Sequence, residues 1–418
     1  MTTFVQVSPH FPESNVYFVE HLASAGVTVL GIGDAWDGQL SGRLRGAMAD
    51  YYRVESLDDF EQVAGAMQWM IDRHGPIDWV ESNSEYWLGL DAGLRTRFGI
   101  ITGHTSEVIP TIRSKAGMKP VYQGAGIPTA RQAPVTDLEA ARAFAVEVGY
   151  PLFFKPEYGI GATDTFTART DDDLAHVMFR IPPQPYVMEE YVTGSIVSYD
   201  AILDADGEPV FEAATQWPPS IAAIVEQDLD LTYRVLAEVP EQLRERGRAT
   251  SHAFGMFNRF VHLEFFRLID AKPGLGEAGD FIALEANMRA AGGATLDMYN
   301  FARNADVYQI YADLVSGHDT GAAEKARRDR QFCVYAGRRD HHGYALSSEE
   351  IWWRYGSDIV RAGRNDPMYW PQMGQDFFML RTPDKERADA FARDVLHRGA
   401  ARSEAGSPAK AETHPKEP

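Results

Sequence analysis

Two acidic segments carry the side chains best suited to chemistry, FVHLEFF and, about twenty residues later, FIALEANMRA. In the second segment Glu285, Asn287 and Arg289 are spaced by two residues, so on a β-strand they project from one face. If the two segments pair as a hairpin with residue numbers summing to about 549, Glu264 lies opposite Glu285. The same register places His262 opposite Asn287.

Two opposed carboxylates repel each other unless a cation lies between them. Hard cations such as Mg²⁺ bind carboxylate and amide oxygens and complete their coordination with phosphate oxygens and water. Glu264, Glu285 and Asn287 therefore predict a platform for Mg²⁺ and a nucleotide, with Arg289 placed to neutralise a terminal phosphate or an acyl-phosphate. The alternative interpretation is the solvated face of an ordinary hairpin.

A lysine before a glycine-rich segment is the second candidate. Lys155 ends the apolar run PLFF, and the following EYGIGATDTF contains Gly159, Gly161 and Thr163. Glycines let backbone N–H groups close over a phosphate, and the lysine adds positive charge. The segment lacks the Gly-Lys-Ser/Thr of a Walker A loop, so a lysine at a hairpin corner is the plainer interpretation.

The third candidate is the strand-to-loop transition PYVMEEYVTG. Its backbone C=O and N–H groups are free to meet the edge of an adenine around Glu189, Glu190 and Val192. Upstream, Lys115 in IRSKAGMK adds another cation.

Other reactive side chains receive plainer interpretations. The single cysteine, Cys333, lies in the apolar RQFCVYAG and is expected to be a core residue. Arg338 and Arg339 either clamp a substrate carboxylate or form a solvated pair. His341 and His342 would point to opposite sides of a strand, which argues against joint metal ligation and favours a hydrogen-bonded structural role.

The elements that position these residues begin with a β-α-β-α-β rhythm over the first hundred residues, which predicts a parallel sheet covered on both faces. Gly31 and Gly33 look like the start of a dinucleotide fingerprint, but no third glycine follows, so we expect a tight turn there. Ser56 is the expected N-cap of the next helix, and Gly75 ends that helix.

A second unit begins near residue 111. We expect helices in DLEAARAFAVEVG, DDDLAHVMF and PEQLRERGRATSHAFGMF and across residues 294–316, with strands in PLFFKP, PYVMEEYV, FVHLEFFRLID and DFIALEANMRA. A hairpin is expected around Ala205-Asp206-Gly207.

Composition limits the classes of function. The chain has 418 residues, with 60 acidic and 40 basic side chains and a net charge of −20, which disfavours a nucleic-acid partner. Without a signal-like leader or an apolar run of the ~18–20 residues that span a bilayer, the sequence predicts a cytoplasmic protein without a membrane partner. The tail from residue 401 is expected to be disordered.

The order of these motifs over residues 100–320 resembles the ATP-grasp superfamily, in particular the carboxylate–amine ligase branch with carbamoyl phosphate synthetase large chain, biotin carboxylase and bacterial L-amino acid ligases. The resemblance implies an α/β fold: a Rossmann-like parallel-sheet domain (1–110), then a two-subdomain α+β ATP-grasp module (111–320) with a lid-like part near 118–190. A C-terminal extension (321–400) and the tail (401–418) follow.

The resemblance also implies roles for individual residues. ATP would contact Lys115 and Lys155, the loop from Tyr158 through Gly159 and Gly161 to Thr163, and the hinge at Glu189, Glu190 and Val192. Mg²⁺, with Mn²⁺ as an alternative, would be held by Glu264, Glu285 and Asn287. Arg289 and Lys155 would act on the transferred phosphoryl group, and Gly292-Gly293 would open a helix whose N–H groups can receive an anion.

One departure concerns the ribose. The family usually has Gly-x-Glu after the hinge, whereas this chain has Gly194-Ser195-Ile196, so Glu190 or Ser195 would have to substitute, or nucleotide affinity is reduced, or the nucleotide binds differently.

The implied reaction joins a small-molecule carboxylate and an amine through an acyl-phosphate, with release of ADP and phosphate. The alternatives are a bicarbonate-activating carboxylase or carbamoyl-forming ligase, and a nucleotide-binding protein with weakened catalysis. A homodimer is one option for the assembly.

Overall fold

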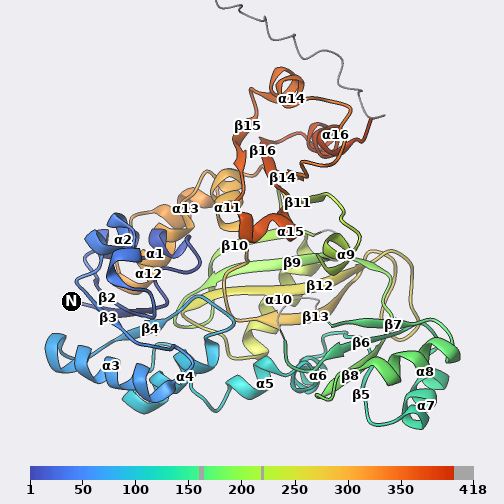
Figure 1. The fold of residues 1–418 in the computed structure, drawn as a ribbon, viewed down its shortest axis with the longest axis horizontal. Helices are drawn as coiled ribbons and strands as arrows, with labels where there is room; N and C mark the ends of the chain where they lie inside the picture. Colours follow the sequence, from blue (N-terminus) through green and yellow to red (C-terminus); the bar gives the residue numbers. More distant parts are fainter. Residues whose placement is uncertain (160–163, 218–220, 400–418) are drawn as a thin grey trace, which may run out of the picture.

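The computed structural model describes residues 1–159, 164–217 and 221–399, without the side chains of residues 221–223. The strands of these residues form three sheets (Figure 1). The N-terminal sheet lies at one end, the largest sheet at the centre and a small sheet at the other end, while the last strands and helices rise above the centre. The expected disordered tail lies outside the described residues.

The N-terminal sheet is parallel, with strand order β3-β2-β1-β4. Its strands are β1 (Thr3–Val7), β2 (Thr28–Gly33), β3 (Asp50–Arg53) and β4 (Trp79–Glu81). The connecting helices are α1 (Asn15–Ser24), η1 (Asp37–Gln39), α2 (Gly42–Ala47), α3 (Phe60–His74) and α4 (Leu88–Phe98). The expected parallel α/β arrangement is confirmed, because short apolar runs alternate with amphipathic helices that cover them.

Two local expectations in this part are wrong. Gly31 and Gly33 lie within β2 rather than in a turn, and a Cβ on Gly31 would come within 2.5 Å of the Met48 sulfur and 2.9 Å of the Tyr51 ring. These glycines therefore allow close packing of the strand. The N-cap of α3 is Asp59, not Ser56, because the Asp59 carboxylate accepts from the backbone N–H groups of Glu61 and Gln62 in the first turn.

The small sheet is antiparallel, in the order β5-β8-β6-β7. Its strands are β5 (Gln132–Pro134), β6 (Leu152–Pro156), β7 (Phe166–Ala168) and β8 (Tyr186–Glu190), and its helices are α7 (Leu138–Val148) and α8 (Asp171–Arg180). The helices α5 (Ile109–Arg113) and α6 (Lys115–Gly124) precede it. Aromatic and aliphatic side chains of α7, α8 and β6 form its core.

The large sheet is antiparallel and eight-stranded, in the order β13-β12-β9-β10-β11-β14-β16-β15. Its strands are β9 (Gly194–Leu203), β10 (Pro209–Gln216), β11 (Leu231–Val235), β12 (Arg259–Leu268), β13 (Phe281–Asn287), β14 (Phe332–Arg338), β15 (Ile359–Arg364) and β16 (Asp376–Thr382). The expected hairpin at residues 205–207 is confirmed as the β9–β10 turn. The C-terminal segment continues this sheet through β14 to β16.

Helices cover the large sheet on both sides. They are α9 (Ile221–Glu226), α10 (Glu241–Ala253), α11 (Thr295–Arg303), α12 (Val307–Ser316), α13 (Ala322–Ala326), α14 (Ser348–Tyr355), η2 (Pro367–Tyr369), α15 (Trp370–Met373) and α16 (Lys385–Leu396). Helix α12 also packs on α1, where the Phe18 ring meets Tyr308 at 4.9 Å and Phe260 at 5.6 Å, edge to face. This shared core joins the N-terminal sheet to the large sheet.

Cys333 is fully buried in the core, as expected, and burial raises the pKa of its thiol.

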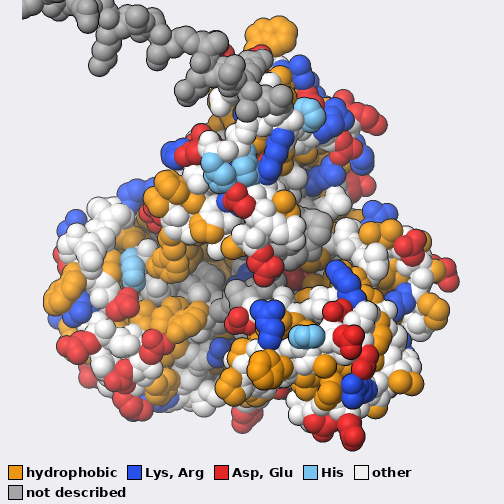
Figure 2. All heavy atoms as spheres, turned by 45° about the vertical axis from the view of Figure 1, so that its right-hand side comes forward, with side chains coloured by type: hydrophobic (Ala, Val, Ile, Leu, Met, Phe, Trp, Pro, Cys, Tyr) orange, Lys and Arg blue, Asp and Glu red, His pale blue; other side chains and the backbone are white. Residues whose placement is uncertain are grey.

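Figure 2 shows acidic and basic side chains interspersed over one face of the molecule, so the net negative charge does not gather into one patch there. Among the described helices, none has the length and apolar character needed to cross a membrane.

Candidate active site

The acidic strands β12 and β13 pair in the expected register. Glu264 lies opposite Glu285 and His262 opposite Asn287, and the register shifts by one residue at a bulge just after Glu264. The prediction is confirmed because the two segments are joined by a glycine-rich turn that leaves few other pairings. Strand β13 ends at Asn287, so Arg289 lies two residues beyond the strand.

The two carboxylates stay partly open. The Glu264 side chain is 25% exposed and the Glu285 side chain 20% exposed, whereas most charged groups around them are buried. Burial raises the pKa of Glu285, the negative charge of Glu264 raises it further, and Lys115 at 3.1 Å opposes both effects. This side of the sheet therefore carries negative charge that is only partly compensated.

A buried histidine supports Glu264 from the sheet. His262 Nδ1 lies 2.6 Å from Asp200 on β9, and its Nε2 lies 3.1 Å from Glu264. Burial alone would lower the pKa of His262, but the two carboxylates outweigh it and raise the pKa to about 9. The imidazolium thus orients Glu264. Asp200 was missed by the sequence analysis, because its pairing with His262 depends on the β9–β12 register.

Three buried lysines gather beside the carboxylates. The Lys155 Nζ lies 2.7 Å from Glu189 and the Lys119 Nζ 2.8 Å from it, on the opposite side of the same carboxylate. Burial alone would raise the pKa of Glu189, but these two lysines hold it at about 2. Sequence analysis missed Lys119, although its position four residues after Lys115 on α6 places both on one helical face.

Lys115 connects the helix α6 to the glycine segment. It is the first residue of α6, where Ser114 caps the helix, and its Nζ donates to the carbonyl oxygen of Gly159 at 3.0 Å. Tyr158 is about half exposed at the start of the same segment. Gly161 and Thr163 lie outside the described residues.

Arg289 meets a residue from the N-terminal sheet. Its Nε donates to the Glu85 carboxylate at 2.8 Å, and Glu85 lies in the loop between β4 and α4. Gly292 and Gly293 follow, just before α11, and the Gly293 backbone has a φ of 65°, which favours glycine. The N-terminal sheet thus contributes a side chain to the site; the sequence analysis missed Glu85 because no motif marks it.

No family model matches the chain. A search of curated proteins finds alanine–anticapsin ligase of Bacillus subtilis, 26% identical over 267 residues and covering 55% of each chain. It also finds an L-arginine-specific L-amino acid ligase of Bacillus subtilis, 23% identical over 273 residues and covering 62% of each chain. The matched part thus spans about half to three fifths of these relatives' length.

Solved structures match over nearly the whole chain. An L-amino acid ligase from Bacillus licheniformis superimposes with a TM-score of 0.70 at 15% identity, covering 96% of this chain and 99% of that one. An ADP complex of N5-carboxyaminoimidazole ribonucleotide synthetase superimposes with a TM-score of 0.67 at 13% identity, covering 94% and 96%. The chain has the ATP-grasp ligase fold.

In this ATP-grasp arrangement the small sheet and the large sheet meet at the hinge after β8. Val192 is buried there among Ala130, Leu268 and Ile282, which fixes the backbone of the hinge. Glu190 is also buried, and its carboxylate accepts from the Arg131 backbone N–H at 2.7 Å and from the Arg131 guanidinium at 2.8 Å. These contacts anchor β5 to β8.

Ile196 stands where the resembled family has the glutamate that binds the ribose, so another residue would have to accept from the ribose hydroxyls. Because Glu190 is engaged by Arg131 and also lies 3.4 Å from Lys272, the structure gives no support for Glu190 as the ribose acceptor. Ser195, in β9 opposite Arg267, is half-buried. Its use in place of the usual acid, a reduced nucleotide affinity and a different mode of nucleotide binding stay predictions.

Arg338 and Arg339 form neither a clamp for a substrate carboxylate nor a solvated pair, so both expectations are wrong. Both are buried: Arg338 donates to the Val395 carbonyl at 2.7 Å, and Arg339 donates to the carbonyls of Leu229 and Pro371 at 2.9 and 2.8 Å. They hold loops of the ATP-grasp core together, because backbone carbonyls that turn inward need donors.

The two adjacent histidines are also placed differently. His341 and His342 follow β14 in a turn, so the expected opposite orientation is wrong, and both rings reach Asp228, His342 at 3.2 Å. His342 also lies 2.9 Å from Asp230. The expected hydrogen-bonded role is confirmed, while the three groups at Asp228 lie close enough together to hold a metal ion.

Proposed function

We propose that this protein is an ATP-dependent ligase that converts a small-molecule carboxylate into an acyl-phosphate and couples it to an amine, releasing ADP and phosphate. The observation that carries the proposal is the opposition of Glu264 and Glu285, with buried Lys115 at 3.1 Å from Glu285 and with buried Lys155 and Lys119 paired to Glu189. A cluster of this kind provides cations for phosphate groups and oxygen ligands for a divalent metal in one place.

The residues present fit Mg²⁺. Glu264, Glu285 and Asn287 offer only carboxylate and amide ligands from one sheet face. Burial and, next to it, the negative charge of Glu264 raise the pKa of Glu285, and a bound cation would offset that charge. When bound, Mg²⁺ supplies positive charge to the phosphate oxygens as the phosphoryl group is transferred. His262 keeps Glu264 ionised and oriented for this role.

The residues also fit the phosphates of ATP. Lys155 and Lys115 extend from two different elements, β6 and α6, toward the glutamates. In the structure Glu189 neutralises Lys155, so nucleotide binding would exchange this internal ion pair for contacts with phosphate. The hinge backbone from Glu189 to Val192 is proposed to meet the adenine, and the segment from Tyr158 to Gly159 to cover the phosphates.

The chemistry needs no nucleophilic side chain. An oxygen of the substrate carboxylate attacks the terminal phosphorus, the bond to the bridging oxygen breaks, and ADP leaves. The amine then attacks the acyl carbon, phosphate leaves with the former carboxylate oxygen, and the amine loses a proton. Arg289 lies two residues beyond β13, where its guanidinium can offset charge on the transferred group.

The two amino-acid ligase relatives favour an amino acid as one of the substrates. ADP complexes among the solved structures of the same fold support the nucleotide. Activation of bicarbonate is not favoured, because the curated ligases of alanine and of L-arginine match 55% and 62% of this chain, whereas a carbamoyl phosphate synthase large chain matches 28%.

The proposal is tested by incubating the full chain with ATP, Mg²⁺ and pools of amino acids and small acids, with and without bicarbonate. Phosphate release is measured and products are identified by mass. We expect substrate-dependent release that falls at least ~100-fold in Lys155→Ala and Glu285→Ala. Lys325→Ala, an exposed lysine on α13, serves as the matched control and should keep full activity.

Three results would contradict parts of the proposal. Equal phosphate release in Lys155→Ala, Glu285→Ala and the control would exclude this site. Release that requires bicarbonate would replace the amine-coupling reaction with a carboxylating one. ATP binding without ADP formation in any pool would indicate a nucleotide-binding protein that lacks turnover.

A further inference from the structure

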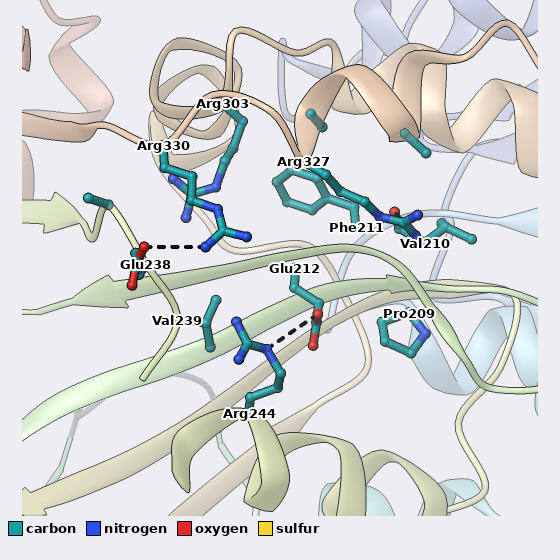
Figure 3. Close-up of a pocket in the computed structure, with 13 residues that line it drawn as sticks. Pro209, Val210, Phe211, Glu212, Glu238, Val239, Arg244, Arg303, Arg327 and Arg330 are labelled. Atoms are coloured by element: carbon teal, nitrogen blue, oxygen red, sulfur yellow. Dashed lines mark hydrogen bonds and ion pairs between the residues drawn. The ribbon is translucent and has the colours of Figure 1, made fainter. Parts of the chain in front are cut away.

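A second cationic site lies at the start of β10, on residues that the proposed ATP site does not use. A pocket of about 80 Å³ opens between the beginning of β10, the loop after β11, helix α10, the end of α11 and the segment after α13 (Figure 3). Four arginines line it: Arg244, Arg303, Arg327 and Arg330. In a protein with a net charge of −20, this density of arginine requires an explanation.

Carboxylates neutralise only two of these arginines. Arg330 pairs with Glu238 at 3.3 Å, and Arg244 lies 3.6 Å from Glu212 and also pairs with Glu241, just outside the pocket. Glu212 is already bound by Arg248 at 2.8 Å, from outside the pocket.

The other two arginines of the pocket lack such a partner. Within the described part of the chain, neither Arg303 nor Arg327 forms an ion pair with a carboxylate. The lining therefore holds four cations and two anions.

Arg303 shows the imbalance most clearly. Its side chain is at the end of α11, the residue is only 4% exposed, and its Nη2 donates to the Leu236 carbonyl at 3.0 Å. Its Nη1 has no hydrogen-bond partner among the described residues. Burial and, next, the neighbouring Arg330 lower the pKa of Arg303 to about 10, so the group is still charged at neutral pH. A buried charged donor without an acceptor is costly.

Figure 3 shows Arg303 and Arg330 side by side above the pocket, Arg244 below them and Arg327 at its side. Guanidinium groups present parallel N–H donors that match the oxygens of phosphate or carboxylate. The volume is far below the ~300–1,000 Å³ typical of pockets for larger ligands. The four guanidinium groups and the small volume thus suit a small oxyanion better than a nucleotide.

We propose that this arginine pocket binds a small oxyanion, either inorganic phosphate or the carboxylate of a small acid. The anion would accept from the free Nη1 of Arg303 and from Arg327, and would offset the excess positive charge. The site does not depend on the proposed ligase activity.

The test is calorimetric titration of the full chain with inorganic phosphate, and separately with sulfate and acetate. Arg327→Ala removes an exposed lining residue, so the variant should fold, and its affinity for phosphate should fall roughly tenfold. Arg328→Ala is the matched control: Arg328 is also exposed, lies one residue further along and pairs with Glu324 outside the pocket. Its affinity should equal that of the unmodified chain.

Two further variants complete the design. Arg303→Met should abolish binding, with thermal unfolding used to verify that it is folded. Lys155→Ala separates this pocket from the proposed ATP site: binding at the arginine pocket persists in it. Binding of acetate but not phosphate would assign the site to a carboxylate, and the reverse would assign it to phosphate.

The proposal is overturned if the unmodified chain binds none of the three anions at millimolar concentration. It is equally overturned if Arg327→Ala and Arg328→Ala bind alike, or if only Lys155→Ala loses binding.

Discussion

Two clusters of buried charge use the same residue types for different purposes. The junction cluster, formed by Glu81, Asp91, Arg95 and Arg259, joins β4 and α4 of the N-terminal sheet to β12. There Glu81 pairs with Arg95 at 2.9 Å and with Arg259, and the three side chains are 5%, 2% and 3% exposed. The glutamates of the candidate active site are instead 25% and 20% exposed.

The two clusters differ in how far their charged side chains are exposed to solvent. In the junction cluster, burial and the neighbouring Glu81 raise the pKa of Asp91 to about 8, so Asp91 is mostly protonated at neutral pH and accepts from Ser82. The one ionised carboxylate, Glu81, is paired with both arginines inside the protein. At the active site the negative charge faces solvent, where a cation can reach it. Buried charge thus indicates a structural role when the cluster is closed and a binding role when it is open.

The largest expected effect on stability comes from opening the junction cluster. Glu81→Gln leaves Arg95 and Arg259 buried without their counter-charge, which costs about 3–5 kcal/mol in the free energy of unfolding. The cost should lie at the lower end, because loss of Glu81 lets Asp91 ionise and compensate in part. Urea unfolding measures the change.

Asp91→Asn is the control for this variant, since it removes a group that is already mostly uncharged; it should cost less than Glu81→Gln. If Glu81→Gln unfolds at the same urea concentration as the unmodified chain, the junction cluster does not hold the two sheets together.

The next largest effect is expected from Glu285→Gln, which should lower ligase activity but not stability. Glu285→Gln keeps the shape of the side chain and removes one of two repelling charges, so the free energy of unfolding should be unchanged or higher. Ligase activity should fall ~10²–10³-fold, because a metal ligand is lost. Phosphate release and urea unfolding are measured on the same preparation. Loss of stability with activity retained would assign Glu285 to a structural cluster like the junction.

The comparison also shows what sequence can reveal. The opposition of Glu264 and Glu285 was predictable, because alternation and a nearby glycine-rich turn fix the register. Glu85 and Asp200 were not predictable, because they reach the site from a loop and a strand distant in sequence. Lys119 was predictable from helical spacing and was overlooked.

The same limit applies to the fold. Short apolar runs alternating with helices predicted the parallel N-terminal sheet, and turn residues predicted the hairpins, whose strands are adjacent in sequence. The pairing of β11 with β14 joins Thr232 to Ala336 across about a hundred residues, and no local pattern encodes it. The turn predicted at Gly31 was wrong for a related reason. The side chains that pack against Gly31, Met48 and Tyr51, come from later elements, and no local pattern shows that contact.

A smaller effect should appear in the pH dependence of stability. The pKa of His262 is about 9 in the folded protein against 6.5 for the free group, so its stabilising contribution is complete below about pH 6.5 and lost as pH rises through 9. Asp91, with a folded pKa of about 8, lowers stability as pH rises from about 4 through 8, and its effect levels off about one pH unit higher. A His262→Gln variant keeps Asp91, so the difference between the two chains reports on His262.

Urea midpoints measured between pH 8 and 9.5 check this. The unmodified chain should lose stability over this interval, and His262→Gln should lose less. Parallel profiles for the two chains would show that Asp200 and Glu264 do not hold a proton on His262.

The smallest effect tests whether burial, rather than residue type, gives the junction cluster its strength. Arg97 lies two residues after Arg95 on α4 and pairs with Glu61 at 2.8 Å, but the two side chains are 47% and 73% exposed. Solvent screens such a pair and both side chains lose conformational freedom in it, so Arg97→Ala should lower the free energy of unfolding in urea by at most ~1 kcal/mol.

Adding salt should shrink even this difference in the free energy of unfolding. The destabilisation caused by Glu81→Gln should hardly respond to salt, because the partners of Glu81 are buried. Equal penalties for the two variants would mean that closure of the cluster does not set the strength of these ion pairs.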